Sequence, residues 1–197
     1  MALSAIEAPK FTDGLFMRGH MRKEHMTQVY FAGLGLVVPP EPVLPIISYR
    51  KYIPEVKYDF LISPYSHSDI QGNKLWPLDR WQVVIDYLAT KGSVGILGAT
   101  TGVYGSVTCT YNQATPVFDQ PLAEVANLIR LAKLVISIDN GISHLTSAVG
   151  SNHILLYPAC LAPTWASNPR LNSITIQDIP ANIQPWQVLE SIDQMET

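Results

Sequence analysis

The sequence predicts an α/β protein built on a Rossmann-like parallel sheet flanked by helices. Two patterns support this prediction. Short apolar runs rich in Val, Ile and Leu alternate with amphipathic helical segments, and several of these runs end directly in polar turns. Strands that alternate with helices are joined by right-handed crossovers, which make the sheet parallel. The 197-residue chain is also long enough to bury a sizeable core.

The alternating pattern begins at residue 58. Before it, residues 27–36 predict a short helix, and residues 37–45 contain four prolines and predict an extended linker. The predicted elements that follow are strands at 58–63, 94–97, 134–138 and 153–157 and helices at 78–91, 121–133, 142–149 and 185–195. We therefore expect an N-terminal remnant with a Pro-rich linker at 1–57 and a Rossmann-like domain with a C-terminal helix at 58–197.

The helices are predicted from the spacing of their apolar residues and from their ends. The segment 121–133 has apolar residues at 122, 125, 128, 129 and 132, which share one helical face, and Pro121 suits a first-turn position. The segment 78–91 is closed by Gly92. Residues 100–116 are rich in β-branched side chains and lack helical spacing, so they predict an irregular or hairpin insertion.

Charge and composition exclude several classes of protein. Thirteen Lys and Arg against sixteen Asp and Glu give a net charge of −3, which offers no broad attraction to nucleic acid. Two cysteines without CxxC spacing predict neither a disulfide framework nor a zinc site. No apolar run reaches the length of a membrane span, and the N-terminus lacks the pattern of a signal peptide, so we expect a cytoplasmic protein.

The balance of apolar and charged residues predicts a partner. The chain is 47% hydrophobic and 15% charged, whereas an average soluble domain carries about 25% charged residues. We expect an apolar surface that is covered by a second copy of the chain in a homodimer or by a partner chain.

Polar turns follow two of the predicted strands. Asp139-Asn140-Gly141 follows strand 134–138, and the loop 63–77 offers Ser66 and an exposed lysine, Lys74. At the carboxyl ends of parallel strands, glycine and the first amides of the next helix favour phosphate binding. The same residues are also typical of an ordinary strand-to-helix turn. His144, in the first turn of that helix, could contact a phosphate or could be a partly buried structural histidine.

Four segments in order resemble glycosyltransferase family 9, the heptosyltransferase-type enzymes. They are KLWPLDRW, VGILGATTG, PLAEVANLIRLAKLVISIDNGISHLTSAVG and ILLYPACLAPTWASNP, and the resemblance covers residues 58–169. The resemblance implies a GT-B fold, in which two Rossmann-like domains face each other. The C-terminal domain binds a nucleotide-sugar donor, typically ADP-heptose, without a metal or another cofactor. This chain would then correspond to the C-terminal half, with the N-terminal domain absent or reduced.

The resemblance also implies roles for individual residues. The positions that match the family's donor-binding residues are Ser66, Lys74, Gln120, Asp139, Asn140, Gly141 and His144. Ser66 and Lys74 would hold the donor diphosphate, Asp139 would contact the donor sugar, and Gln120 would line the nucleobase. The remaining three would form the turn and helix start around the phosphates.

The chain departs from the family in two places. Family members carry an acidic residue after the VGILG-like strand to bind the ribose, whereas this chain has Ala99-Thr100-Thr101-Gly102. An N-terminal acceptor domain of the usual size needs ~100 residues and does not fit before residue 58. Asp13 is a candidate for the catalytic base, although nothing before it resembles the strand that presents that base in the family.

The main functional hypothesis is a glycosyltransferase, or its donor-binding domain, that moves a heptose-like or hexose sugar from a nucleotide-diphosphate sugar to a glycan acceptor. One alternative is a non-catalytic module that binds nucleotide sugars or has a structural role. A second alternative is a glycosyltransferase that modifies nucleic acid, against which the acidic charge balance argues.

Overall fold

A computed structural model describes residues 37, 54–66, 74–100, 110–159 and 173–195. The described part forms a six-stranded sheet in the order β3-β2-β1-β4-β5-β6, and every neighbouring pair is parallel. The strands are β1 (Phe60–Ser63), β2 (Val94–Gly98), β3 (Thr115–Phe118), β4 (Leu134–Ile138), β5 (His153–Pro158) and β6 (Ser173–Asp178). This strand order confirms the predicted Rossmann-like α/β fold.

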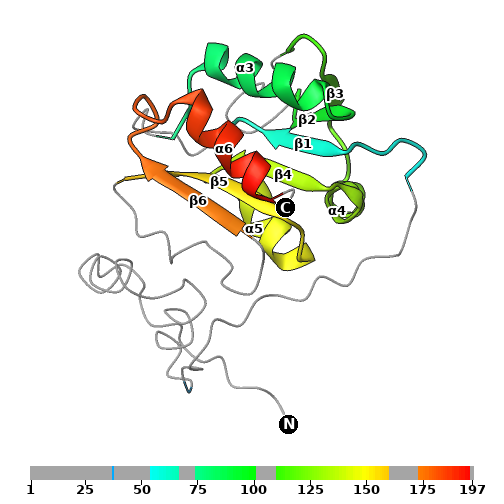
Figure 1. Cartoon of the computed structure of the whole chain (residues 1–197). Helices are drawn as coiled ribbons and strands as arrows, with labels where there is room; N and C mark the ends of the chain where they lie inside the picture. Colours follow the sequence, from blue (N-terminus) through cyan, green and yellow to red (C-terminus); the bar gives the residue numbers. More distant parts are fainter. Residues whose placement is uncertain (1–36, 38–53, 67–73, 101–109, 160–172, 196–197) are drawn as a thin grey trace.

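Helices cover both faces of the sheet (Figure 1). They are α3 (Leu78–Ala89), α4 (Leu122–Leu131), α5 (Gly141–Val149) and α6 (Pro185–Met195). One apolar cluster, which includes Trp76 and Trp81, joins α3 and α6 to one face of the sheet. A second cluster joins α4 and α5 to the opposite face. Burial of each large apolar side chain contributes about 1.5 to 3 kcal/mol relative to exposure, so these two clusters hold the layers together.

For the predicted strands and helices between residues 58 and 195, the predicted bounds agree with the structure to within two residues. Strand β4 has the predicted ends, and its five residues are all buried. Two strands were missed. Strand β3 contains Pro116, and β6 is only partly buried along its length, so neither resembles the apolar runs of the central strands. Both are edge strands, where proline and partial exposure are tolerated.

Only part of the segment 100–116, for which an irregular or hairpin insertion was expected, is described, so that expectation stays a prediction. Its last two residues belong to strand β3, which runs parallel to β2 with Ile96 opposite Pro116. Residues 101–109 lie outside the described residues, as do the predicted helix at 27–36 and the candidate base Asp13. The domain boundary at residue 57 therefore stays a prediction.

Among the described residues, no helix combines the length and apolar character needed to cross a membrane.

At the end of the sheet where the strands begin, Asp59 connects the residues that precede β1, β2 and β4. Its Oδ1 lies 2.9 Å from Lys133 Nζ, and its Oδ2 accepts hydrogen bonds from the backbone N–H and the hydroxyl of Ser93 at 2.9 and 2.8 Å. These contacts, the Lys133 hydrogen bond first, lower the pKa of Asp59 to about 2. A Cβ at position 92 would lie 2.6 Å from Oδ2, which explains why this position carries Gly92.

Asp59→Asn should therefore change the acid stability of the fold. A carboxyl with a lowered pKa stabilises the folded state above its unfolded pKa, near 3.8, and that contribution is lost as the pH falls toward 2. We expect the variant to lose about 1 to 2 kcal/mol of unfolding free energy at pH 6 and to show a flatter decline between pH 4 and pH 2. Urea unfolding across this range measures both effects. The matched control is Glu190→Gln, at an exposed position of α6. The assignment would be contradicted if the unfolding free energies of the parent and Asp59→Asn fell in parallel as the pH is lowered.

Candidate functional site

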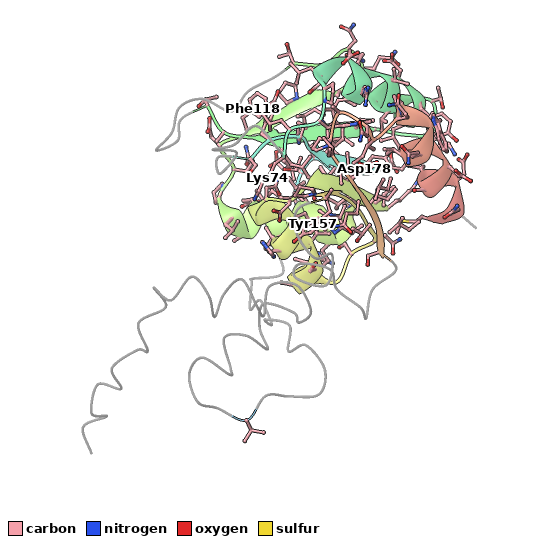
Figure 2. The ribbon with its side chains drawn as sticks, turned by 90° about the vertical axis from the view of Figure 1, so that its left-hand side faces the viewer. Lys74, Phe118, Tyr157 and Asp178 are labelled. Atoms are coloured by element: carbon pink, nitrogen blue, oxygen red, sulfur yellow. The ribbon has the colours of Figure 1, made fainter. Side chains whose placement is uncertain are left out.

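The candidate site lies where the strand order reverses, at the carboxyl ends of β1 and β4. In sequence order the chain passes from β1 outward to β2 and β3 and then returns to the other side of β1 to form β4. Ser63 at the end of β1 is paired with Ser137 in β4, so the two loops that follow these strands start side by side. In open α/β sheets ligands bind at this point. Figure 2 looks toward these strand ends, with Lys74 between Phe118 and Tyr157 in the view.

Asn140 connects the two loops. Its side-chain Oδ1 accepts hydrogen bonds from Ile142 N and Ser143 N at 2.9 and 3.1 Å, so Asn140 is the N-cap of α5. Its Nδ2 donates to Ser63 Oγ at 3.0 Å and to the carbonyl of Tyr65 at 2.6 Å. One side chain thus caps the helix that follows β4 and holds the loop that follows β1.

The Asn140 cap corrects one expectation from the sequence. The first amides of the helix were expected to donate hydrogen bonds to a phosphate, but the amides of Ile142 and Ser143 donate to Asn140 itself. Asn140 thus has a structural role in this turn.

Lys74 and Asp139 form an ion pair across the same two loops. Lys74 Nζ lies 2.7 Å from Asp139 Oδ2, and the exposed fractions of the two side chains are 22% and 8%. The prediction of an exposed lysine is therefore wrong, because Lys74 lies against a buried carboxylate. The two residues that the sequence placed in separate ligand loops are brought into direct contact.

The loop that carries Lys74 is anchored to the C-terminal part of the chain. Trp76, two residues further on, is buried and donates from Nε1 to the carbonyl of Ile183 at 2.9 Å. Its ring packs edge-on against Trp81, with ring centres 4.9 Å apart. Arg80 Nη1 donates to the carbonyls of Ala181 and Ile183. The turn before α6 thus holds the backbone close to Lys74, a contact that no pattern in the sequence indicated.

Gly141 starts α5 beside this ion pair, and the described structure gives no internal reason for a glycine there. A Cβ at Gly141 would have no described heavy atom within 4 Å. Gly150, at the other end of the same helix, is the one glycine of the described segments with a positive φ, at 88°. Among the described residues, nothing occupies the place of that Cβ, and a glycine in such a position suits close approach of a ligand to the backbone.

Neither nearby histidine adds positive charge at neutral pH. Burial lowers the pKa of His144, and the charge of Lys74 lowers it further, whereas the charge of Asp139 acts in the opposite direction. His153 is buried in β5, lies with Nε2 2.8 Å from Ser137 Oγ, and has its pKa lowered to about 3 by burial. His144 thus lies in the first turn of α5 as a partly buried imidazole on which the charges of Lys74 and Asp139 act in opposite directions.

The other predicted site residues also follow the carboxyl ends of strands. Ser66 is half-buried and directly follows Tyr65, whose carbonyl is held by Asn140. Gln120 is exposed after β3, and its Nε2 donates to the carbonyl of Phe118 at 3.1 Å. The structure places Gln120 two strands from β1, at the far edge of the sheet, and shows no contact that assigns it a role.

The sequence analysis missed a carboxylate that also follows the carboxyl end of a strand. Asp119 follows β3 with a φ of 57°, and its Oδ1 accepts from the backbone N–H of Thr100 at 2.8 Å. The Thr100 hydroxyl donates to its Oδ2. The end of β2, which has no acidic residue of its own, is thus supplied with one from the neighbouring strand. The signal was the same as at Asp139, an acid directly after a strand, but β3 itself was not recognised.

These features define a class of fold, a doubly wound parallel sheet in which a lysine and a helix that begins at a glycine lie where the strand order reverses. Nucleotide-binding α/β proteins bind their ligands at the same place in such a sheet. The sequence matches glycosyltransferase family 9 (heptosyltransferase) over residues 51–170, which is more than half of the chain. The chain therefore belongs to glycosyltransferase family 9. A search among curated proteins found no match.

Solved structures share the fold. A family 9 glycosyltransferase from Veillonella parvula superposes with a TM-score of 0.68 at 15% identity, over 88% of this chain and 60% of that one. The E. coli ADP-heptose LPS heptosyltransferase II gives 0.64 at 15% identity, over 87% and 62%. The iron-containing dodecameric glycosyltransferase TibC from enterotoxigenic E. coli gives 0.67 at 19% identity, over 89% and 56%. This chain thus spans about 60% of the length of these proteins.

Replacing Asn140 should show how much the two loops depend on it. Asn140→Ala removes the cap and both ties, and we expect it to lower the unfolding free energy by about 2 to 3 kcal/mol. Asn140→Ser keeps a capping oxygen but is too short to reach Ser63 or Tyr65, so its loss should be smaller, about 1 to 2 kcal/mol. Urea unfolding of the two variants measures the difference. A loss below about 0.5 kcal/mol for Asn140→Ala would show that the ties contribute nothing.

Proposed function

We propose that this chain binds a nucleotide-diphosphate sugar at the carboxyl ends of β1 and β4, as the donor-binding part of a glycosyltransferase that acts on a glycan acceptor. The observation that carries the proposal is the Lys74–Asp139 pair beside the open approach to Gly141. An ammonium group suits a diphosphate, a carboxylate suits sugar hydroxyls, and an open glycine permits close approach of the backbone.

The proposed chemistry uses these groups during sugar transfer. An acceptor hydroxyl attacks the anomeric carbon, the bond from that carbon to the diphosphate oxygen breaks, and the diphosphate leaves with the electron pair. The Lys74 ammonium stabilises the negative charge that develops on the leaving diphosphate. A base must take the proton of the acceptor hydroxyl. Asp13, which lies outside the described residues, remains the candidate that the sequence offers.

ADP-heptose is the donor to test first. The similar E. coli enzyme is described as an ADP-heptose heptosyltransferase, and TibC has been solved in complex with ADP-D-β-D-heptose. The described residues of this chain contain no group of three or more His, Cys, Asp or Glu placed to hold a metal ion. Our proposal is a metal-independent donor site, so added EDTA should leave donor binding unchanged.

Gly141→Ala and Gly150→Ala should separate ligand binding from stability. Alanine at 141 meets open space and suits a helix better than glycine, so the unfolding free energy should stay the same or rise by up to about 1 kcal/mol. Binding of ADP-heptose should weaken at least tenfold, because the new methyl group blocks close approach. Alanine at 150 is strained at φ 88° and should cost about 1 kcal/mol while binding is kept.

Urea unfolding and calorimetric titration with ADP-, GDP- and UDP-sugars measure both properties on the same samples. Unchanged binding by Gly141→Ala, or no binding by the parent of any of these donors, would reject the proposed site.

We also propose that the chain self-associates, most simply as a homodimer. The composition is 47% hydrophobic, and large apolar side chains such as Leu122 and Trp186 are 68% and 62% exposed. TibC, a similar protein, is dodecameric. Multi-angle light scattering should give a mass above the 21.8 kDa of one chain, and a concentration-independent monomer would contradict this proposal.

A further inference from the structure

Asp139 is unusual among the charged residues of this structure. It is the one carboxylate that is buried among the described residues, with 6% of the residue exposed. Its Oδ2 lies 2.7 Å from Lys74 Nζ, in the loop after β1. A buried carboxylate is tolerated when a cation compensates it and is costly when that cation is lost. The state of Asp139 therefore depends on what Lys74 binds.

A diphosphate at Lys74 would compete with Asp139 for the same ammonium. It brings at least two negative charges next to a carboxylate that is largely screened from water, where like charges repel strongly. The neighbouring groups that the structure describes compensate this repulsion only weakly. Burial lowers the pKa of His144, which disfavours its charged form, and the Asn140 amide already donates to Ser63 and Tyr65. Nucleoside diphosphate alone thus leaves Asp139 poorly compensated.

An intact sugar nucleotide changes this balance. Its sugar is attached to the second phosphate, removes one ionisable oxygen from the diphosphate and carries hydroxyl groups. Hydroxyls that donate hydrogen bonds to Asp139 would replace part of what Lys74 supplied. The intact sugar nucleotide therefore donates hydrogen bonds to Asp139, whereas the nucleoside diphosphate product places a like charge beside it.

We propose that Asp139 is a specificity-determining residue that makes the site favour the intact sugar nucleotide over the nucleoside diphosphate produced by sugar transfer. The inference rests on the proposed function, since it takes the diphosphate to bind at Lys74. It adds a property that sugar contact alone does not require: the carboxylate weakens binding of the product, and so promotes its release after the sugar has left.

Calorimetric titration of ADP and ADP-heptose against the parent protein and Asp139→Asn tests the inference. Asparagine has the same shape without the charge. We expect the variant to bind ADP at least tenfold tighter than the parent does and to bind ADP-heptose no tighter. The ratio of the two dissociation constants should therefore fall at least tenfold. Asp178→Asn is the matched control, because Asp178 ends the edge strand β6 on the same side of the sheet, and it should leave the ratio unchanged.

The parent protein gives a result that needs no variant, since ADP-heptose should bind at least tenfold tighter than ADP. Circular dichroism checks the fold of Asp139→Asn, and Asp139→Ser replaces it if the fold is lost. Unchanged or weaker ADP binding by the folded variant, with ADP-heptose still bound by the parent, would overturn the inference and leave the proposed function standing. A parent protein that binds neither compound, nor GDP-mannose or UDP-glucose, would overturn both.

Discussion

The hydrogen bonds of the Asn140 side chain set the geometry on which the rest of the candidate site depends. The amide oxygen caps α5, and the amide nitrogen donates to Ser63 and Tyr65. Because β1 and β4 are the strands at which the strand order reverses, this single side chain ties together the two central loops. Asp139 is thereby placed at the end of β4 where Lys74 can reach it.

In the proposed function, the Lys74–Asp139 pair links the stability of the fold to ligand binding. Each residue neutralises the other within the fold, yet each is suited to a different part of a sugar nucleotide, the ammonium to the diphosphate and the carboxylate to the sugar. A ligand that engages only one of them leaves the other uncompensated in a largely buried place. The buried Trp76, bonded to Ile183, limits how far the Lys74 loop can adjust. Under the proposed function, the site recognises charge balance between protein and ligand rather than the number of contacts.

The sequence predicted the central sheet well, because β1, β2, β4 and β5 are short apolar runs that are buried on both faces. It missed β3 and β6, whose exposed residues and proline reflect their places at the edges. It identified both polar loops, since each follows an apolar run. It could not show that Asn140 caps its own helix or that Lys74 meets Asp139, because those contacts depend on the pairing of β1 with β4. Gly141 and Gly150 could not be told apart without their φ angles and surroundings.

A crystal structure of the protein grown with ADP-heptose tests the central claim most directly. The account predicts a diphosphate oxygen within hydrogen-bond distance of Lys74 Nζ, the second phosphate against the Gly141 backbone and a sugar hydroxyl at Asp139, with the Lys74–Asp139 separation longer than 2.7 Å. A sugar nucleotide bound elsewhere, with Lys74 still paired to Asp139, would contradict it.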